Sequence, residues 1–298
     1  MSKTADLAYA AGWGLLRGVP APVARGAFRL GADLAARRDG PSVRQLRKNL
    51  ARVVPKAGGA ELDALVRDAL RSYARYWMET FRLPTMDTKA IVAKLDEEFV
   101  GRPLLDAALD RGKGLICALP HTGNFDVSGL WLVEKYGSFT TVVERLKPES
   151  VYRRFMAYRE SLGFEILPAG DQSAYRTLIE RLRQNRIVCL PADRDLSSRG
   201  VPVTFFGEQT RMPAGPARLA ALTGAQLVVV DNWFTDDGWG VRVHSPTLVH
   251  GREEVAAATQ HMADAFAADI AANPVDWHMM QKLWLADLVD GDMPVEAR

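Results

Sequence analysis

The stretch from Gly114 to Asp126, GLICALPHTGNFD, decides how this chain folds. Its first six residues form an apolar run of strand length, and Pro120 ends that run. A helical pattern follows at Val127–Tyr136. A buried strand that passes through a short polar loop into a helix is the repeating unit of an α/β sheet, so we predict that fold class here.

The same alternation continues toward the C-terminus. Short apolar runs, bounded by Gly, Pro or charged residues, lie at Phe139–Val143, Phe164–Leu167, Ile187–Leu190 and Leu227–Val230. Helical patterns lie between them, and a last one covers about Glu253–Ala272. We therefore predict a central, mostly parallel sheet flanked by helices, with Val241–His244 as an antiparallel edge strand.

Toward the N-terminus the pattern is helical throughout residues 5–83. A first helix is expected to end near Gly18, and a second covers Val23–Arg38. The longest covers Glu61–Leu83, where apolar side chains recur at helical spacing until Pro84. We predict one domain over residues 1–298, made of a helical cap (1–84) and an α/β core (85–298).

Charge is distributed unevenly along the chain. Residues 1–56 contain eleven Lys/Arg and three acids, a balance of +8, so the remainder carries −6 to give the total of +2. A basic arm on an acidic body indicates an anionic partner, either a membrane surface or nucleic acid. The longest uncharged stretch near the N-terminus, Leu7–Leu16, is ten residues long, against roughly 20 for a membrane span. We expect a cytosolic or peripheral protein.

The loop after the first strand carries the candidate chemistry. Ligands of open α/β sheets bind beyond the carboxyl ends of the strands, and His121 lies at such an end. A histidine there can act as a general base near neutral pH if an acid fixes its tautomer. Asp126, at the first turn of the following helix, is placed to fold back onto it. The alternative is an aspartate that caps the helix beside a histidine with no catalytic role.

His-x4-Asp at a strand-to-helix junction resembles the signature of the glycerolipid acyltransferase superfamily, and HTGNFD is similar to its lipid A acyltransferase branch. Further segments strongly resemble the actinobacterial phosphatidylinositol mannoside acyltransferases, and together they cover nearly the whole chain. These segments are DLAYAAGWGLLRGVP (Asp6–Pro20), ERLKPESVYRRF (Glu144–Phe155), YRESLGFEILP (Tyr158–Pro168), RDLSSRGVPVTFFGEQTRMPAGPARLA (Arg194–Ala220) and DWHMMQKLW (Asp276–Trp284).

The resemblance implies a membrane-associated acyltransferase that needs no cofactor besides acyl-CoA as co-substrate. A palmitoyl group would pass to a mannose hydroxyl of a phosphatidylinositol mannoside at the cytoplasmic face of the cell membrane. His121 would deprotonate the hydroxyl and Asp126 would orient His121. The family has a Glu at the position of Asp193, which is one methylene shorter. An acid is retained at this position, but its side chain is shorter. The sequence therefore leaves open whether Asp193 contacts His121.

By the same resemblance, polar residues after later strands form the mouth of the site. They would bind the phosphate-bearing headgroup of the acceptor or the CoA phosphates, a task suited to the planar fork of arginine. The alternative for each is a solvated turn or a surface ion pair. The expected substrate-binding residues are Glu144, Arg145, Lys147, Arg194, Asp195, Thr210 and Arg211.

Two other functions remain open from the residues alone. The first is a hydrolase that uses the same His/Asp pair on a lipid ester or thioester. The second is a non-catalytic binding protein that uses the basic arm, although the arm lacks the interleaved aromatic residues that stack on nucleic acid bases. For the same reason we expect no nucleic acid as partner. The histidines have no metal-like spacing, so we expect no metal either. His278 receives no role.

Overall fold

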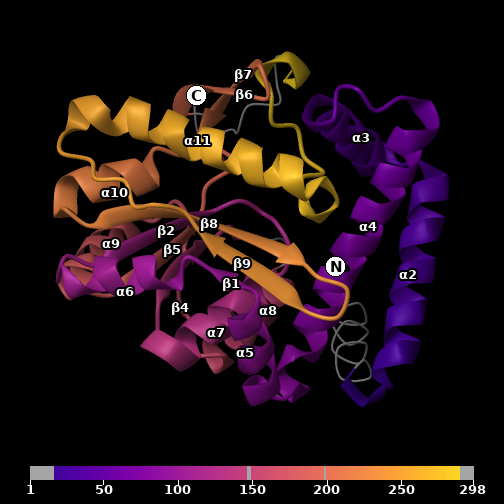
Figure 1. Cartoon of the computed structure of the whole chain (residues 1–298), viewed down its shortest axis with the longest axis horizontal. Helices are drawn as coiled ribbons and strands as arrows, with labels where there is room; N and C mark the ends of the chain where they lie inside the picture. The colour runs from indigo at the N-terminus through magenta and orange to yellow at the C-terminus, as the bar shows by residue number, and fades with distance from the viewer. Residues whose placement is uncertain (1–16, 146–148, 198, 289–298) are drawn as a thin grey trace.

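A seven-stranded sheet forms the centre of the computed structural model, which describes residues 17–145, 149–197 and 199–288 (Figure 1). The strand order is β1-β9-β8-β2-β5-β3-β4, and all neighbours are parallel except β8 and β9. The strands are β1 (Phe99–Val100), β2 (Leu115–Leu119), β3 (Thr140–Val143), β4 (Glu165–Pro168), β5 (Ile187–Pro191), β8 (Gln226–Phe234) and β9 (Trp239–Val243).

The five apolar runs predicted as strands are confirmed as β2, β3, β4, β5 and β8. The run at Val241–His244 is also a strand and is antiparallel to β8, as predicted, but its position at the edge is wrong. Phe99 and Val100 pair with Val241 and Arg242 on its outer side. A two-residue strand is too short to leave a periodic pattern, which is why the sequence did not reveal it.

A separate two-stranded hairpin also went unpredicted. It consists of β6 (Val201–Phe205) and β7 (Glu208–Met212), joined by Phe206 and Gly207, both with positive φ. Two central residues of this kind make the tight turns that suit the twist of a hairpin. The strands bury only alternate side chains, so they do not form the continuous apolar runs seen in the main sheet.

Helices cover both faces of the sheet. All five residues of β2 are buried, as expected for a central parallel strand. Its side chains alternate between two apolar cores, one shared with α9, α10 and α11 and the other with α5, α6, α7 and α8. Figure 1 shows α10 and α11 above the sheet and α5 and α7 below it. These helices are α5 (Thr88–Glu97), α6 (Arg102–Asp110), α7 (Phe125–Tyr136), α8 (Glu149–Ser161), α9 (Gln172–Arg183), α10 (Gly215–Thr223) and α11 (Val255–Ala272).

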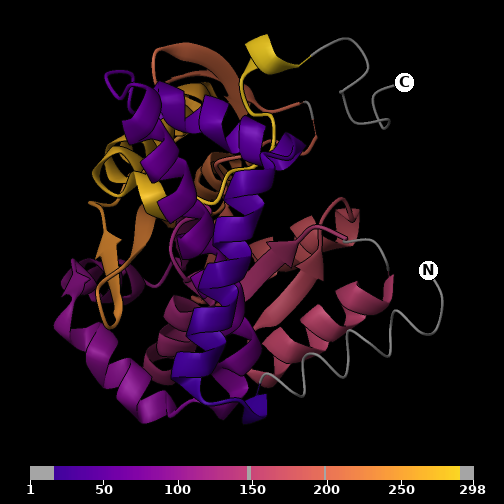
Figure 2. The same cartoon turned by 90° about the vertical axis from the view of Figure 1, so that its right-hand side faces the viewer.

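Three further helices stand against the side of this core (Figure 2). They are α2 (Ala21–Arg38), α3 (Pro41–Val53) and α4 (Gly59–Arg82), and they share a third apolar cluster around Leu46 and Leu50. They confirm the helical pattern, although the helix expected before Gly18 lies almost wholly outside the described residues. Across the described ranges, no helix combines the length and the apolarity needed to cross a bilayer.

Candidate active site

Two residues meet where neighbouring strands end. In the β2–β5 pair, Leu119 lies opposite Pro191. His121 follows the first and Asp193 follows the second, each by two residues. Because parallel strands point the same way, this register brings the two side chains together at the carboxyl edge of the sheet, where ligands bind in folds of this kind.

Asp193 is the partner of His121. Its Oδ1 lies 2.6 Å from His121 Nδ1, and its Oδ2 accepts the backbone N–H of His121 at 3.0 Å and the indole N–H of Trp277 at 3.1 Å. Asp193 is fully buried, whereas the His121 side chain is 39% exposed. A carboxylate at Nδ1 holds the proton on that nitrogen, so Nε2 carries the lone pair that a general base needs.

The electrostatics of the pair favour a basic imidazole. Burial lowers the pKa of His121 and the Arg194 and Arg159 guanidiniums act in the same direction, but the charge and hydrogen bond of Asp193 outweigh them. The pKa of His121 therefore lies above its ordinary value of 6.5. Burial raises the pKa of Asp193, yet the charge of His121 and the hydrogen bonds from His121 and Trp277 hold it below 3.8. Asp193 is thus a carboxylate when His121 takes up a proton.

The Asp126 carboxylate bonds to residues other than His121, contrary to the expectation from the sequence. Its Oδ1 accepts Arg159 Nε at 2.9 Å, and its Oδ2 lies 3.5 Å from the hydroxyls of Tyr76 and Thr80. Within the described residues, none of its hydrogen bonds goes to His121. The expectation that Asp126 orients His121 is therefore corrected, since a buried arginine holds this carboxylate and Asp193, in the loop after β5, takes its place. The sequence showed no sign of the Asp126–Arg159 pair, because nothing local links the two residues.

The loop that carries His121 is anchored by side chains that we did not single out from the sequence. Asn124 donates to Glu79 Oε2 at 2.8 Å, and its own Oδ1 accepts the N–H of Val127 at the start of α7. Gly123 has φ +53, and a Cβ there would lie 2.7 Å from the Asn232 backbone. A larger residue at position 123 would displace the loop, so glycine is required for this close approach.

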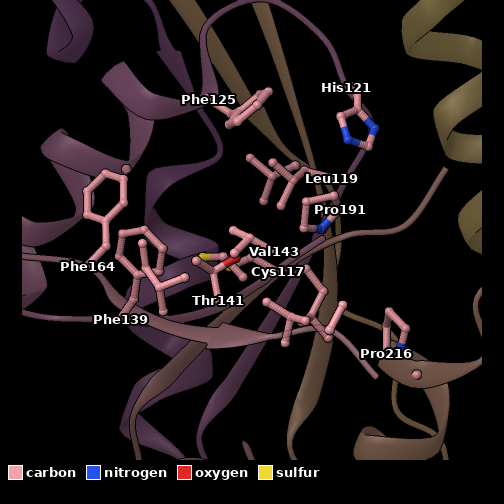
Figure 3. Close-up of a pocket in the computed structure, with 18 of the residues that line it drawn as sticks. Cys117, Leu119, His121, Phe125, Phe139, Thr141, Val143, Phe164, Pro191 and Pro216 are labelled. Atoms are coloured by element: carbon pink, nitrogen blue, oxygen red, sulfur yellow. The ribbon is translucent and has the colours of Figure 1, made fainter. Parts of the chain in front are cut away.

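An apolar cavity of about 530 Å³ opens beside His121. Figure 3 shows His121 above Leu119 and Pro191, with Phe139 and Phe164 on the opposite side of the view. The cavity reaches both faces of the sheet, because Cys117 and Leu219, which belong to the two different cores, both line it. Its size falls within the range of roughly 300–1,000 Å³ that is usual for ligand sites, and its walls suit a hydrocarbon chain.

Polar residues at the rim are arranged partly as expected. Glu144 and Arg194 line the cavity and form an ion pair at 3.7 Å. Asp195 also lines it, but its carboxylate closes a turn by accepting the N–H groups of Ser197 and Gly200.

Two other expected rim residues do not lie at the cavity wall. Arg145 is exposed and pairs with Glu149 at 3.0 Å, and it is not among the residues that line the cavity. Lys147 lies outside the described residues.

The Thr210-Arg211 block lies away from the cavity. Thr210 is fully buried and donates its hydroxyl to the Leu283 carbonyl at 2.6 Å, which ties the hairpin to the C-terminal segment. Arg211 donates to the Gly200 carbonyl at 3.3 Å. Neither residue lines the cavity. Each of the two side chains donates to a backbone carbonyl of the chain, so the contact with acceptor phosphate expected from the resemblance does not follow from their placement.

Comparison with known proteins identifies the family of this chain. The family model for "Bacterial lipid A biosynthesis acyltransferase" matches residues 1–286. The chain belongs to this family. It is therefore an acyltransferase, and the His121–Asp193 pair beside an apolar cavity is its candidate active site.

Curated relatives of this acyltransferase match over almost their full length. It is 55% identical, over 97% of its chain and 94% of the relative, to a phosphatidylinositol mannoside acyltransferase of Mycolicibacterium smegmatis. It is 54% identical, over 97% of its chain and 91% of the relative, to the protein of the same name from Mycobacterium tuberculosis H37Rv.

Among the described residues of the acyltransferase, no three His, Cys, Asp or Glu side chains form a group that could hold a metal ion.

Proposed function

We propose that this acyltransferase moves a fatty acyl group, palmitoyl in the first instance, from acyl-CoA to a mannose hydroxyl of a phosphatidylinositol mannoside. The reaction takes place at the cytoplasmic face of the cell membrane with His121 as the general base. The names of the curated relatives support the acceptor class. The observation that carries the proposal is the His121–Asp193 pair at the opening of an apolar cavity, because a base and a lipid-binding space meet there.

The geometry supports direct transfer. His121 Nε2 removes the proton from the acceptor hydroxyl while the hydroxyl oxygen attacks the carbonyl carbon of the thioester. The carbon–sulfur bond then breaks, and the CoA thiolate takes the proton from the imidazolium. Asp193 stabilises the imidazolium between these steps. No acyl-enzyme is needed, and the nearby Cys189 is a poor nucleophile because its hydrogen bond with Cys117 and its burial raise the pKa of its thiol.

The two substrates require different surroundings. The acyl chain leaves water for the cavity, whose wall includes Phe139, Phe164 and Leu219. Burial of a hydrocarbon chain contributes about 0.8 kcal/mol per methylene, so chain binding can position the thioester against His121. The phosphates of CoA or of the acceptor headgroup remain at the polar rim, where Arg194 lies.

Membrane association rests on α2. Three apolar side chains on one stripe of this helix, Val23, Leu30 and Leu34, are 61%, 61% and 43% exposed. Arg25 and Arg29 are exposed on the same helix. Exposed apolar side chains together with exposed arginines on one helix are typical of helices that lie in the interface of an anionic membrane. This surface holds the enzyme at the bilayer that contains its lipid acceptor.

The decisive experiment measures transfer of labelled palmitate from palmitoyl-CoA to purified mono- and dimannosylated phosphatidylinositol. His121→Ala is run beside the wild type, with His261→Ala as the matched control because His261 is exposed on α11. The expected result is an acceptor-dependent product with wild type and His261→Ala that is lost with His121→Ala.

Other outcomes would contradict the proposal. Release of free palmitate at a rate that does not depend on the acceptor would identify a hydrolase that uses the same His121 base. Full transfer activity in His121→Ala would remove His121 from the reaction. Transfer to phosphatidylinositol without mannose would place the acceptor in a different lipid class.

A further inference from the structure

The segment Asp276–His278 runs alongside the loop that carries the candidate base. The His278 N–H donates to the His121 carbonyl at 2.9 Å, and the Gly123 N–H donates to the Asp276 carbonyl at 2.9 Å. Between these bonds Thr122 and Trp277 form an antiparallel bridge. The loop that carries His121 is therefore held by strand-like backbone hydrogen bonds to Asp276–His278. Its conformation depends on this segment, which lies far along the chain.

This segment is itself fixed at both ends. Asp276 accepts the Ser72 hydroxyl at 2.6 Å and the Phe234 N–H at 2.8 Å. His278 Nε2 lies 3.0 Å from the same Ser72 hydroxyl, and burial, reinforced by the charge of His121, lowers the pKa of His278 to about 3. His278 is thus neutral at physiological pH. It serves as a buried hydrogen-bonding anchor and not as a second base.

Trp277 connects the segment to Asp193. Among the described residues, the carboxylate of Asp193 has three N–H donors, and two of them belong to His121 itself. The third is the indole N–H of Trp277, which donates to Oδ2 at 3.1 Å across 84 residues of chain. Trp277 has no exposed surface, and Phe205 and Trp284 pack around its ring at centroid distances of 6.1 Å. The indole is therefore held in one orientation by its neighbours.

The position of this donor has a chemical consequence. A carboxylate can rotate about its bond to Cβ, and rotation would take Oδ1 away from His121 Nδ1. A rigid donor at Oδ2 opposes that rotation. Hydrogen bonds to charged groups are stronger and more directional than neutral ones. The His121 backbone N–H also donates to Oδ2, but it moves with the loop that carries the base, so the indole N–H is the donor that ties the plane of the carboxylate to the packed core.

We propose that Trp277 is a positioning residue for the acyl transfer: its indole N–H fixes the plane of the Asp193 carboxylate so that Oδ1 holds the Nδ1 proton of His121. The inference rests on the proposed function, because it assigns Trp277 to the same reaction. It gives the segment DWHMMQKLW, which the resemblance singled out without a role, a link to the base.

The chain offers a matched pair of variants. Trp277→Phe removes the indole N–H from Asp193 and keeps an aromatic ring. Trp284→Phe makes the same change in a neighbouring, equally buried tryptophan whose N–H donates to the Phe205 carbonyl at 3.0 Å and not to Asp193. We expect Trp277→Phe to lower kcat about 10- to 100-fold with little change in KM, and Trp284→Phe to lower it less than about 3-fold.

The pH profile separates positioning from general damage. A poorly oriented Asp193 stabilises the imidazolium less, so the acid limb of kcat should move to lower pH in Trp277→Phe, in the same direction as in Asp193→Asn but by less. Loss of folded protein would lower kcat without moving that midpoint. An unchanged or raised midpoint in Trp277→Phe, or equal effects of the two tryptophan variants, would overturn the proposal.

A second measurement does not depend on activity or on the folding of a tryptophan variant. In protein labelled with ¹⁵N-tryptophan, the indole resonance of Trp277 should shift in Asp193→Asn while that of Trp284 stays in place. If both resonances stay in place, Trp277 does not sense Asp193 and the inference is wrong. If wild type transfers no acyl group but the Trp277 resonance shifts, the proposed function fails and the hydrogen bond stands.

Discussion

Asp193 Oδ1 lies 2.6 Å from His121 Nδ1, although 72 residues separate the two in the chain. The short reach of aspartate, which left this contact open at the level of sequence, is sufficient because the register of β2 and β5 brings both residues to the same point. The pair has the arrangement of a base and its orienting acid, and it makes Asp193 the first residue to test.

Asp193→Asn should lower kcat by about 10²–10⁴-fold, because an amide no longer stabilises the imidazolium or fixes the tautomer of His121. The neutral form of His121 is the active one, so kcat falls as pH drops through the pKa of His121. Asp193 raises that pKa. The midpoint of the acid limb should therefore move to lower pH in the variant. A kcat–pH series with acyl-CoA and acceptor in excess measures both effects, and an unshifted midpoint would argue against the pairing.

Asp126→Asn should act mainly on stability. It leaves Arg159, whose side chain is 10% exposed, without the carboxylate that neutralises it. Removing one partner of a buried ion pair costs about 3–5 kcal/mol, whereas replacing both with apolar groups is often neutral. Urea unfolding should show this loss for Asp126→Asn and a substantial recovery for Asp126→Leu combined with Arg159→Met.

The kinetics of Asp126→Asn supply the comparison with Asp193. The fraction of Asp126→Asn that remains folded should keep the acid-limb midpoint of the wild type, because its hydrogen bonds do not reach His121. A midpoint shift as large as that of Asp193→Asn would restore Asp126 to the orienting role that the sequence suggested.

Cys117→Leu should shorten the acyl chain that the enzyme prefers. Cys117 is buried in β2 and lines the cavity, so a larger side chain takes up space that the hydrocarbon would fill. We expect kcat/KM with palmitoyl-CoA to fall at least about tenfold relative to that with octanoyl-CoA, since each excluded methylene forfeits about 0.8 kcal/mol. Cys117→Ala, which removes volume, is the control. An equal loss for both donors would show that the chain does not reach Cys117.

Asp231→Asn should stabilise the protein at neutral and alkaline pH. Asp231 is 1% exposed, and burial together with repulsion from Asp269 raises its pKa to about 7. Between pH 3.8, the ordinary pKa, and about 7, the folded state keeps a proton that the unfolded state has lost. Stability of the wild type therefore declines as pH rises through this window and stays reduced above it.

The increase in the free energy of unfolding caused by Asp231→Asn should depend on pH over the same range. It should be small near pH 4, grow up to about pH 7 and reach about 2–4 kcal/mol at pH 8. Urea unfolding at several pH values measures this difference. Asp264→Asn, which changes an exposed carboxylate on α11, should show no comparable growth with pH. A pH-independent gain in Asp231→Asn would mean that the carboxyl titrates normally.

Leu30→Glu should weaken binding to anionic vesicles. It places a negative charge in the exposed apolar stripe of α2, and loss of one buried leucine in the membrane interface lowers partitioning about tenfold or more. Leu222→Glu is the matched control, because Leu222 is similarly exposed, at 55%, at the other side of the fold on α10. Sedimentation with vesicles that contain phosphatidylinositol measures both variants. Equal loss in both would show that α2 is not the contact surface.

The amino-acid sequence by itself determined the local elements of this protein. The apolar run before Pro120, the loop with His121 and the helix after it could be predicted because hydrophobic periodicity and turn residues act over short stretches of chain. The class of the fold followed from the alternation of such units. The same local signals missed β1 and the β6–β7 hairpin, whose strands are too short or too exposed to form continuous apolar runs.

Only the tertiary structure decided which acid serves His121. Asp126 is near in sequence, but Arg159 on α8 holds it, and Asp193 reaches His121 because β5 pairs with β2. Strand order is set by long-range packing and hydrogen bonding, which leave no periodic trace in one sequence. A carboxylate pairs with whichever partner the fold brings within about 3 Å, and that distance is a property of the assembled sheet.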